Sequence, residues 1–197
     1  MKPVRRITGR VAVLDRPDVD TDQIMPKQFL KRIERTGYGE FLFHDWMADP
    51  AFELRRPGCE GASILVAGRN FGCGSSREHA AWALEDRGFR VVLAPSFGDI
   101  FRTNAVKTGL APIAVEPEAL ARIVAAVAAR NELTVDLETL RISHPDGLDV
   151  AFAFDPYDRE TLLHGLDDVA RTLARADEIA AYEAERPPRF DTRSLPA

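Results

Sequence analysis

The chain has too few cysteines for a disulfide framework and no hydrophobic run long enough for a membrane span. Only Cys59 and Cys73 occur among its 197 residues, a number typical of the reducing cytoplasm. No apolar run approaches the roughly 20 residues that cross a bilayer. Arg10 interrupts the first apolar stretch, and no small-residue cleavage site follows it. We therefore expect a cytoplasmic protein without a signal peptide or a membrane segment.

An excess of basic residues is also missing. Lys and Arg total 26 against 31 Asp and Glu, which gives a net charge of −5 and argues against a nucleic-acid surface. An iron–sulfur cluster usually takes about three or four thiolates, and a structural zinc about four nitrogen or sulfur ligands. Two cysteines cannot hold a cluster, and the four histidines show no ligand spacing. The sequence therefore predicts that another chain supplies any metal cofactor.

Apolar runs of strand length alternate with stretches of helical spacing over the first two thirds of the chain. This alternation is typical of an α/β fold. Strands are expected at residues 7–14, 63–67, 89–94 and 110–115. Helices are expected at residues 26–31, 40–47, 78–85, 96–108 and 118–130, with Ser96 as the N-cap of the fourth and Gly109 as its C-cap.

The pattern changes after residue 130. Period-two alternation at residues 133–142, a turn, and a further apolar run at 148–154 predict a hairpin-like β region, so we expect a mixed sheet. Residues 158–185 are predicted to be helical. The sequence therefore favours one α/β domain over residues 1–186, in which helices flank a mixed sheet and form a C-terminal extension, followed by a flexible tail at residues 187–197.

The most informative stretch is residues 72–79, Gly-Cys-Gly-Ser-Ser-Arg-Glu-His, which joins a predicted strand to a predicted helix. The first N–H groups of a helix have no partner within it, and the helix dipole favours negative charge there. A glycine loop that leads into such an end is a ready site for a carboxylate or a phosphate. Arg77 adds a planar guanidinium that suits a carboxylate, so the motif predicts a small acidic ligand.

Other interpretations of this stretch are weaker or purely structural. Ser75 and Glu78 also fit a capping box, which stabilises a helix without any function. No Gly-Lys-Ser/Thr follows the glycines, and the third glycine of a dinucleotide-binding loop is missing. Cys73 is interpreted as a small buried filler, and His79 as a partner in a structural hydrogen bond rather than a catalyst.

An acidic segment at residues 18–24, Asp-Val-Asp-Thr-Asp-Gln-Ile, follows the first predicted strand. Taken alone it fits a solvated turn, because Asp and Thr side chains bond to nearby backbone groups. It lacks the glycine turn and the terminal Glu of a calcium loop. Near an arginine-bearing anion site, Asp22 could orient a catalytic partner or set its proton affinity.

Residues 20–30 and 70–79 together resemble the small subunits of 3-isopropylmalate dehydratase, which correspond to the swivel domain of the aconitase family. Residues 96–101, 109–113, 165–168 and 180–183 match the same family in type and order. The resemblance covers about residues 4–186. Matching motifs in the right order across this span are far more specific than any one of them.

The resemblance implies a swivel-type α/β domain and a hydro-lyase of leucine biosynthesis. Such an enzyme interconverts 2- and 3-isopropylmalate, hydroxylated dicarboxylates, through isopropylmaleate. In the family a large subunit binds the [4Fe–4S] cluster through three cysteines, and the small subunit closes the site. The expected partner is therefore the large subunit of 3-isopropylmalate dehydratase, and the expected cofactor lies on that partner rather than on this chain.

The resemblance also assigns roles to individual residues. Ser75 would be the catalytic base, acting as an alkoxide, while Ser76 and Arg77 would bind a substrate carboxylate. Asp22 would support the acid–base network, and Thr21 would shape the loop. The family's substituent recognition involves residues 28–46, and an isopropyl group would prefer an apolar wall. That wall could include four residues: Ile24, Met25, Phe29 and Leu30.

Two further hypotheses stay open at this stage. The chain could be a closely related hydro-lyase subunit that acts on citraconate, methylmalate derivatives or homocitrate. Arg32 and Arg35 also keep aconitase and homoaconitase open, because their substrates carry an extra carboxylate for which a nearby cation is expected. The chain could also be a noncatalytic binding module that retains the fold. Four positions depart from the usual family pattern without touching the Ser75–Arg77 set: Met25, Arg69, Gly98 and Ala105.

Overall fold

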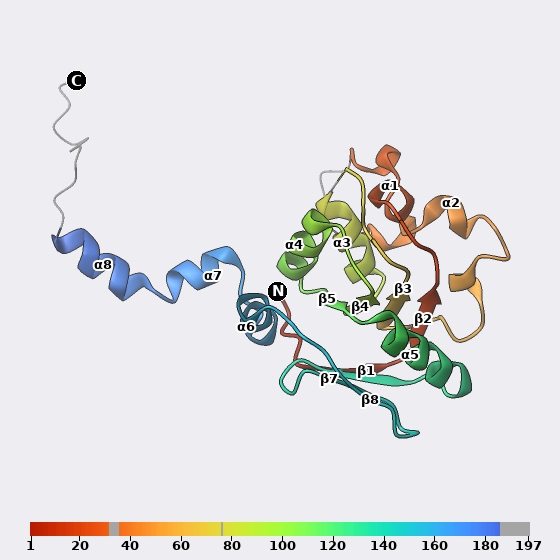
Figure 1. The fold of residues 1–197 in the computed structure, drawn as a ribbon. Coiled ribbons are helices and arrows are strands. Elements are labelled where there is room, and N and C mark those ends of the chain that lie inside the picture. Colours follow the sequence, from red (N-terminus) through yellow and green to blue (C-terminus); the bar gives the residue numbers. More distant parts are fainter. Residues whose placement is uncertain (32–35, 76, 186–197) are drawn as a thin grey trace. The chain divides into compact units, whose positions relative to one another are not determined.

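The computed structural model describes residues 1–31, 36–75 and 77–185. The chain divides into two compact units, Met1–Gly165 and Leu166–Ala197, and each is described by itself. Figure 1 shows the elements of the first unit, which contains both β-sheets and helices α1 to α6.

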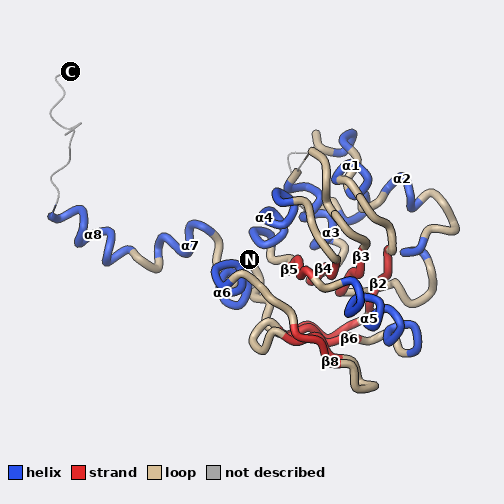
Figure 2. The backbone as a smooth tube through the Cα atoms, viewed as in Figure 1, coloured by secondary structure: helices blue, strands red, loops and turns tan. Residues whose placement is uncertain are grey.

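A four-stranded parallel sheet forms the centre of the first unit, and Figure 2 marks its strands in red. Neighbouring strands follow each other in sequence, and every pairing is parallel. The inner two strands are buried along their whole length, which explains their continuous apolar sequences. In spatial order the strands are β2 (Val11–Leu14), β3 (Ile64–Ala67), β4 (Val91–Ala94) and β5 (Ala111–Ala114).

Helices cover both faces of this sheet (Figure 1). On one face, α3 (Glu78–Asp86) and α4 (Asp99–Thr108) pack with residues such as Leu65 in one core cluster. On the other face, α5 (Pro117–Ala129) packs with the alternate strand residues, including Ile64, in a second cluster. Side chains alternate between the two faces of a strand, so neighbouring strand residues belong to different clusters. A parallel sheet with helices on both faces confirms the α/β prediction.

A second, antiparallel sheet adds its inward-facing residues to the core cluster of α5. Its strand residues alternate between buried and more exposed positions, as expected for a sheet with one solvated face. In spatial order its strands are β1 (Arg6–Gly9), β6 (Leu133–Asp136), β7 (Arg141–Ser143) and β8 (Asp149–Ala151).

The predicted strand at residues 7–14 is divided at Arg10 between the two sheets. The Arg10 carbonyl accepts hydrogen bonds from the backbone N–H groups of Ser63 (3.1 Å) and Ile64 (3.2 Å). The chain packs tightly here, since a Cβ at Gly9 would overlap the Ser63 hydroxyl. Parallel and antiparallel pairing therefore both occur, as predicted, but in two sheets rather than in one mixed sheet.

Short helical turns fill the segment between β2 and β3. The predicted helix at residues 40–47 is interrupted at Phe43, whose φ of 52° is left-handed. The predicted helix at residues 26–31 is a single 3₁₀ turn. The turns are α1 (Thr21–Ile24), η1 (Lys27–Phe29), η2 (Gly39–Phe41), α2 (His44–Met47) and η3 (Glu53–Arg55).

The C-terminal end of α4 was predicted correctly, and its N-terminal end was not. Gly109 is the C-cap with a left-handed φ of 89°, as expected for a residue without a Cβ. Ser96 is not the N-cap. Gly98 occupies that position, and a Cβ there would lie 2.5 Å from the Gly72 carbonyl oxygen. The Ser96 hydroxyl instead accepts a hydrogen bond from the Asn70 backbone N–H at 2.9 Å.

The predicted helical region at residues 158–185 consists of three helices, because Gly165 (φ 65°) ends the first. They are α6 (Pro156–His164) in the first unit, and α7 (Asp168–Leu173) and α8 (Ala176–Glu185) in the second. The prediction of one domain over residues 1–186 stays a prediction, and the tail at 187–197 lies outside the described residues. Each helix of the described ranges is too short or too polar to span a bilayer.

Candidate active site

The two motifs singled out in the sequence lie side by side at the carboxyl ends of neighbouring strands. The acidic segment follows β2 and the glycine-rich loop follows β3. The Val19 carbonyl accepts hydrogen bonds from the N–H groups of Gly72 (2.8 Å) and Cys73 (3.2 Å). The Thr21 N–H donates to the Cys73 carbonyl at 3.0 Å. Backbone pairing therefore brings together segments about fifty positions apart in the sequence.

Thr21 links the two loops through its side chain as well. Its hydroxyl donates a hydrogen bond to the Ser75 carbonyl oxygen at 2.6 Å. The Thr21 side chain is buried, whereas Ser75 is exposed. A buried hydroxyl thus fixes the backbone of Ser75 and leaves the serine at the surface, where it can meet a ligand.

Asp22 and Arg77 form an ion pair across the same junction. The Arg77 guanidinium lies 3.4 Å from the Asp22 carboxylate, and the two side chains are 25% and 49% exposed. Ion pairs this exposed contribute little stability. Arg77 is therefore held beside Ser75 by a carboxylate that water, or another carboxylate, can replace.

Glycine is required for the path of the loop between β3 and α3. Gly72 and Gly74 have left-handed φ values of 74° and 84°. A Cβ at Gly72 would also overlap the Phe101 ring. These two glycines allow the chain to reverse closely against α4 and to present Ser75 and Arg77 ahead of α3.

The capping interpretation of Ser75 and Glu78 is wrong. The N-cap of α3 is Arg77, which makes no side-chain cap hydrogen bond. The capping box lies instead in the acidic segment, at the start of α1. There the Asp20 carboxylate accepts from the Gln23 N–H at 2.8 Å, and the Gln23 side chain accepts from the Asp20 N–H at 2.9 Å. This box stabilises the turn that carries Thr21 and Asp22.

Asn70 is a structural contributor that the sequence analysis missed. Its amide donates to the Asp18 carboxylate at 2.9 Å, and its backbone N–H donates to the Ser96 hydroxyl. Asp18 also pairs with Arg69 at 3.2 Å. Asn70 and Asp18 both have left-handed φ values, 56° and 55°, a conformation that Asn and Asp tolerate better than most residues. That tolerance, next to a glycine loop, is the signal that could have identified them.

Cys73 and His79 lie close to this site. Cys73 is partly buried, and desolvation followed by the charges of Asp20 and Asp18 raises the pKa of its thiol. His79 lies against the rings of Trp82 and Tyr38, with centroids 4.7 Å and 5.2 Å away. Desolvation by burial lowers the pKa of His79. Both pKa shifts favour the neutral form of the group, and His79 packs against aromatic rings.

The remaining predicted site residues lie in different environments. Ile24 and Met25 are fully buried in the core, so of the expected apolar wall only Phe29 and Leu30 are partly exposed. Phe29 stacks on the ring of Phe41 with centroids 4.2 Å apart. Two sets of predicted site residues lie outside the described residues: Ser76, and the pair Arg32 and Arg35. Within the described ranges, no group of three or more His, Cys, Asp or Glu side chains is arranged to hold a metal ion.

Known proteins are similar to this chain in both sequence and fold. The profile of the aconitase C-terminal domain family matches residues 1–118. The chain is 50% identical over 193 residues to the 3-isopropylmalate dehydratase small subunit of Bacillus subtilis (strain 168), covering 94% of this chain and 97% of the relative. It is 56% identical over 192 residues to the protein of the same name from Koribacter versatilis, covering 93% and 98%.

A solved structure agrees with these sequence relatives. The crystal structure of 3-isopropylmalate dehydratase from Methanocaldococcus jannaschii superposes with a TM-score of 0.66 at 26% identity, covering 90% of this chain and 99% of that one. The fold is therefore the swivel-type α/β domain that the sequence predicted. The family profile, the relatives that match nearly the whole chain and the solved structure all indicate the same family. The chain therefore belongs to the small-subunit family of 3-isopropylmalate dehydratase, within the aconitase C-terminal domain family.

Proposed function

We propose that this chain is the small subunit of a two-chain hydro-lyase that interconverts 2-isopropylmalate and 3-isopropylmalate through isopropylmaleate, in leucine biosynthesis. The observation that carries the proposal is the junction of the two loops, at which Ser75 and Arg77 meet Thr21 and Asp22. Relatives at about half identity over nearly the whole chain carry the name of this enzyme, which supports the substrate assignment.

Arg77 is proposed to bind a substrate carboxylate. A guanidinium presents two parallel N–H groups to a carboxylate, and the first N–H groups of α3 add positive potential at the same place. Asp22 holds this guanidinium in the free chain. In the complex the substrate carboxylate shares or replaces Asp22 on Arg77, and Asp22 supports the proton transfers. Ser76 is proposed to donate to the same carboxylate.

Ser75 is proposed to be the base. Dehydration takes a proton from the carbon next to a carboxylate, and hydroxide leaves the neighbouring carbon. The proton passes to the Ser75 alkoxide, which becomes a hydroxyl, and rehydration at the other carbon returns it. A serine hydroxyl is a weak base, so Ser75 depends on the positive potential of Arg77 and the α3 terminus. Thr21 fixes the backbone of Ser75 for this step.

The cofactor is proposed to be a [4Fe–4S] cluster held by the large subunit. The two cysteines of this chain occupy separate places, Cys59 before β3 and Cys73 in the glycine loop, and two thiolates do not make up a cluster's ligand set. When bound, the cluster supplies Lewis acidity toward the leaving hydroxyl. Ser75 and Asp22 are exposed, so a second chain that covers them would exclude water from the reaction.

The test is an anaerobic reconstitution. The purified chain is mixed with a cluster-loaded large subunit, and isopropylmaleate formation from 3-isopropylmalate is followed. We expect turnover only with both chains, and a loss of at least about a thousandfold in kcat for Ser75→Ala, since this removes the base. Ser143→Ala, on β7, is the matched control and should leave kcat unchanged.

Each alternative outcome has a definite meaning. Turnover that survives in Ser75→Ala would retain the enzyme and reject the base. No turnover with an intact cluster would reject the isopropylmalate assignment, and a panel of citraconate, methylmalate derivatives and homocitrate would then test the related hydro-lyases. Inactivity on the whole panel would favour a noncatalytic role.

A further inference from the structure

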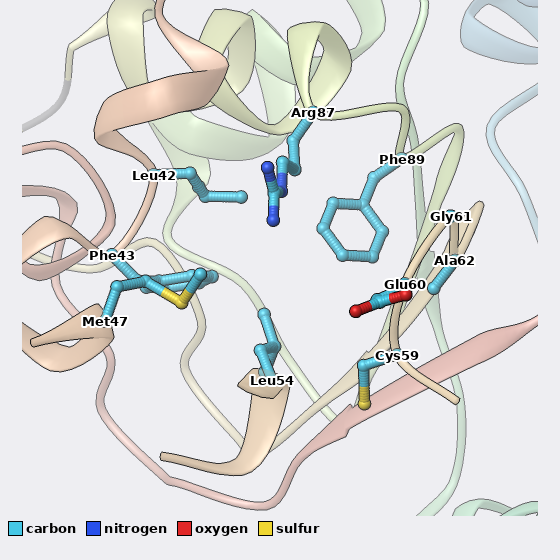
Figure 3. A pocket seen from close by; sticks show the side chains of 10 residues that line it. All are labelled: Leu42, Phe43, Met47, Leu54, Cys59, Glu60, Gly61, Ala62, Arg87 and Phe89. Carbon is cyan, nitrogen blue, oxygen red and sulfur yellow. The ribbon is translucent and has the colours of Figure 1, made fainter. Parts of the chain in front are cut away.

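A cavity of about 40 Å³ lies at the opposite end of α3 from the candidate active site. Most of its lining residues are apolar, and the lining comes from the segment between β2 and β3 and from the connection between α3 and β4 (Figure 3). Two side chains that carry a full charge at neutral pH, Arg87 and Glu60, lie on the same cavity, beside the thiol of Cys59. The apolar part of the lining includes Leu42, Phe43, Met47, Leu54 and Phe89.

The two charged groups extend over this lining from different segments. Figure 3 shows the Arg87 guanidinium between Leu42 and Phe89, and the Glu60 carboxylate directed into the same space. Arg87 follows the last turn of α3, and Glu60 precedes β3. Within the described part of the chain, neither side chain makes an ion pair. The cavity therefore offers one anion-binding and one cation-binding group above an apolar floor.

The size of the cavity limits the ligand. One water-sized probe occupies roughly 10–15 Å³ by this measure, so the enclosed space accepts about three such groups, the size of a two- or three-carbon chain. A simple anion would be attracted by Arg87 but repelled by Glu60, and a simple cation would meet the reverse. A zwitterion satisfies both groups at once.

We propose that this cavity binds a short-chain aliphatic α-amino acid. Its carboxylate bonds to the Arg87 guanidinium, its ammonium donates to the Glu60 carboxylate, and its side chain packs on Leu54 and Phe89. The site shares no residue with the Ser75–Arg77 junction and does not rest on the proposed catalytic function. Binding there would join the end of α3 to the segment before β3.

The experiment is a ¹H–¹⁵N titration of the full chain with L-2-aminobutyrate, whose ethyl side chain fits the enclosed space. We expect saturable shifts of the backbone amides of Gly61, Ala62 and Phe89. A ligand of about seven non-hydrogen atoms binds in the millimolar range at best, so the titration runs to about ten times that range. Butyrate lacks the ammonium and propylamine lacks the carboxylate. Each should bind at least about tenfold more weakly.

Variants connect the shifts to the two charged groups. Arg87→Gln and Glu60→Gln should each weaken L-2-aminobutyrate binding by about tenfold or more, whereas Arg122→Gln, on the exposed face of α5, should not change it. Circular dichroism confirms that each variant is folded. The proposal is overturned if no saturable shifts occur at Gly61 and Ala62. Equal binding of all three probes, or binding that is insensitive to both substitutions, would also overturn it, because a direct Arg87–Glu60 ion pair or a purely apolar site would explain those results.

Discussion

At the scale of single residues, the Arg77–Asp22 ion pair bears directly on the proposed binding of an anion at the candidate site. Their 3.4 Å ion pair is partly exposed, and such pairs contribute from about zero to 1 kcal/mol. The free energy lost when a ligand carboxylate replaces Asp22 on Arg77 is therefore small. Asp22 also keeps the guanidinium oriented toward the junction when no ligand is bound, so the site is preorganised rather than formed by the ligand.

Arg77→Lys tests the importance of the guanidinium's planar shape. Lysine keeps the positive charge but binds a carboxylate as a single point donor. We expect kcat/KM of the reconstituted enzyme to fall by about tenfold to a hundredfold, largely through a higher KM for isopropylmalate. Steady-state kinetics measure this split. A variant with unchanged KM would mean that Arg77 does not contact the substrate.

Thr21→Val tests the hydrogen bond that holds Ser75. Valine matches threonine in shape but cannot donate to the Ser75 carbonyl. We expect the free energy of unfolding to fall by about 1 kcal/mol and kcat to fall by more than this loss of stability explains. Thr21→Ser keeps the hydroxyl and should restore kcat. Urea denaturation and kinetics of both variants check this, and equal kcat values for the two would contradict it.

His79 gives a pH dependence whose sign follows from its burial. Desolvation lowers its pKa below the ordinary value of 6.5, so the folded state favours the neutral ring. Its contribution to stability is then fully present above about pH 6.5 and is lost as the pH falls toward the folded-state pKa. NMR titration of the ring protons should give a pKa under 6.5. His79→Gln should lose less stability than the wild type between about pH 7 and pH 5.

The candidate site was largely predictable from residue types, but its supporting contacts were not. Glycines, hydroxyls and an arginine at a strand-to-helix junction indicate an anion site from local chemistry alone. Ser75 and Glu78 also fit a capping box, but the box occurs at Asp20, because both segments fit the motif and only tertiary pairing selects one. The residue types of Asn70 and Asp18 indicate that each can adopt a left-handed φ, but their contact joins positions distant in sequence, and a single sequence does not indicate which distant residues pair.

At the scale of elements, the glycine loop between β3 and α3 is the most constrained connection. Gly72→Ala places a Cβ in the Phe101 ring and keeps a left-handed φ. We expect a loss of roughly 2–4 kcal/mol, since overpacking adds to backbone strain. Gly61→Ala is the matched control, because Gly61 has a φ of 68° and nothing within 4 Å of its Cβ position. It should cost only about 1–2 kcal/mol.

Chemical denaturation of both glycine variants measures the difference. Equal losses for Gly72→Ala and Gly61→Ala would mean that the loop moves away from Phe101 at little cost. In that case the close approach of the loop to α4 would not be part of what shapes the site.

Most elements were predictable because a strand or helix buried on one or both faces leaves a strong apolar pattern, as in β3, β4 and α5. The exceptions occur where a single residue changes the chain direction. Arg10 lies inside an apolar run but is the point where the chain passes between sheets. Phe43 breaks a helix through a left-handed φ that bulky residues seldom adopt. Tertiary packing decides both.

At the scale of the whole molecule, both core clusters lie within the first unit. Their buried residues run from Val4 to Leu162, and the Val4 N–H donates to the Leu162 carbonyl at 2.8 Å. The second unit begins at Leu166. The hydrophobic stabilisation of the first unit is therefore complete before the chain enters α7.

A truncation after Gly165 tests this division. We expect cooperative unfolding with a midpoint within about 4 °C of the full chain, a shift that corresponds to roughly 1 kcal/mol or less. Differential scanning calorimetry measures it. A much larger decrease would show that residues 166–186 belong to the same cooperative domain, as the sequence predicted. Truncation just before α6, after Phe154, is the comparison and should unfold the first unit.

The two loops of the candidate site are joined chiefly by main-chain hydrogen bonds, through Val19, Thr21 and Cys73. Main-chain bonds are available to any residue except proline, so their strength does not depend on the side chains at these positions. Mutational drift at the exposed loop positions can therefore alter ligand preference while the alignment of the loops persists. Such a junction lets a lineage explore new substrates through single substitutions, each of which starts from an assembled site.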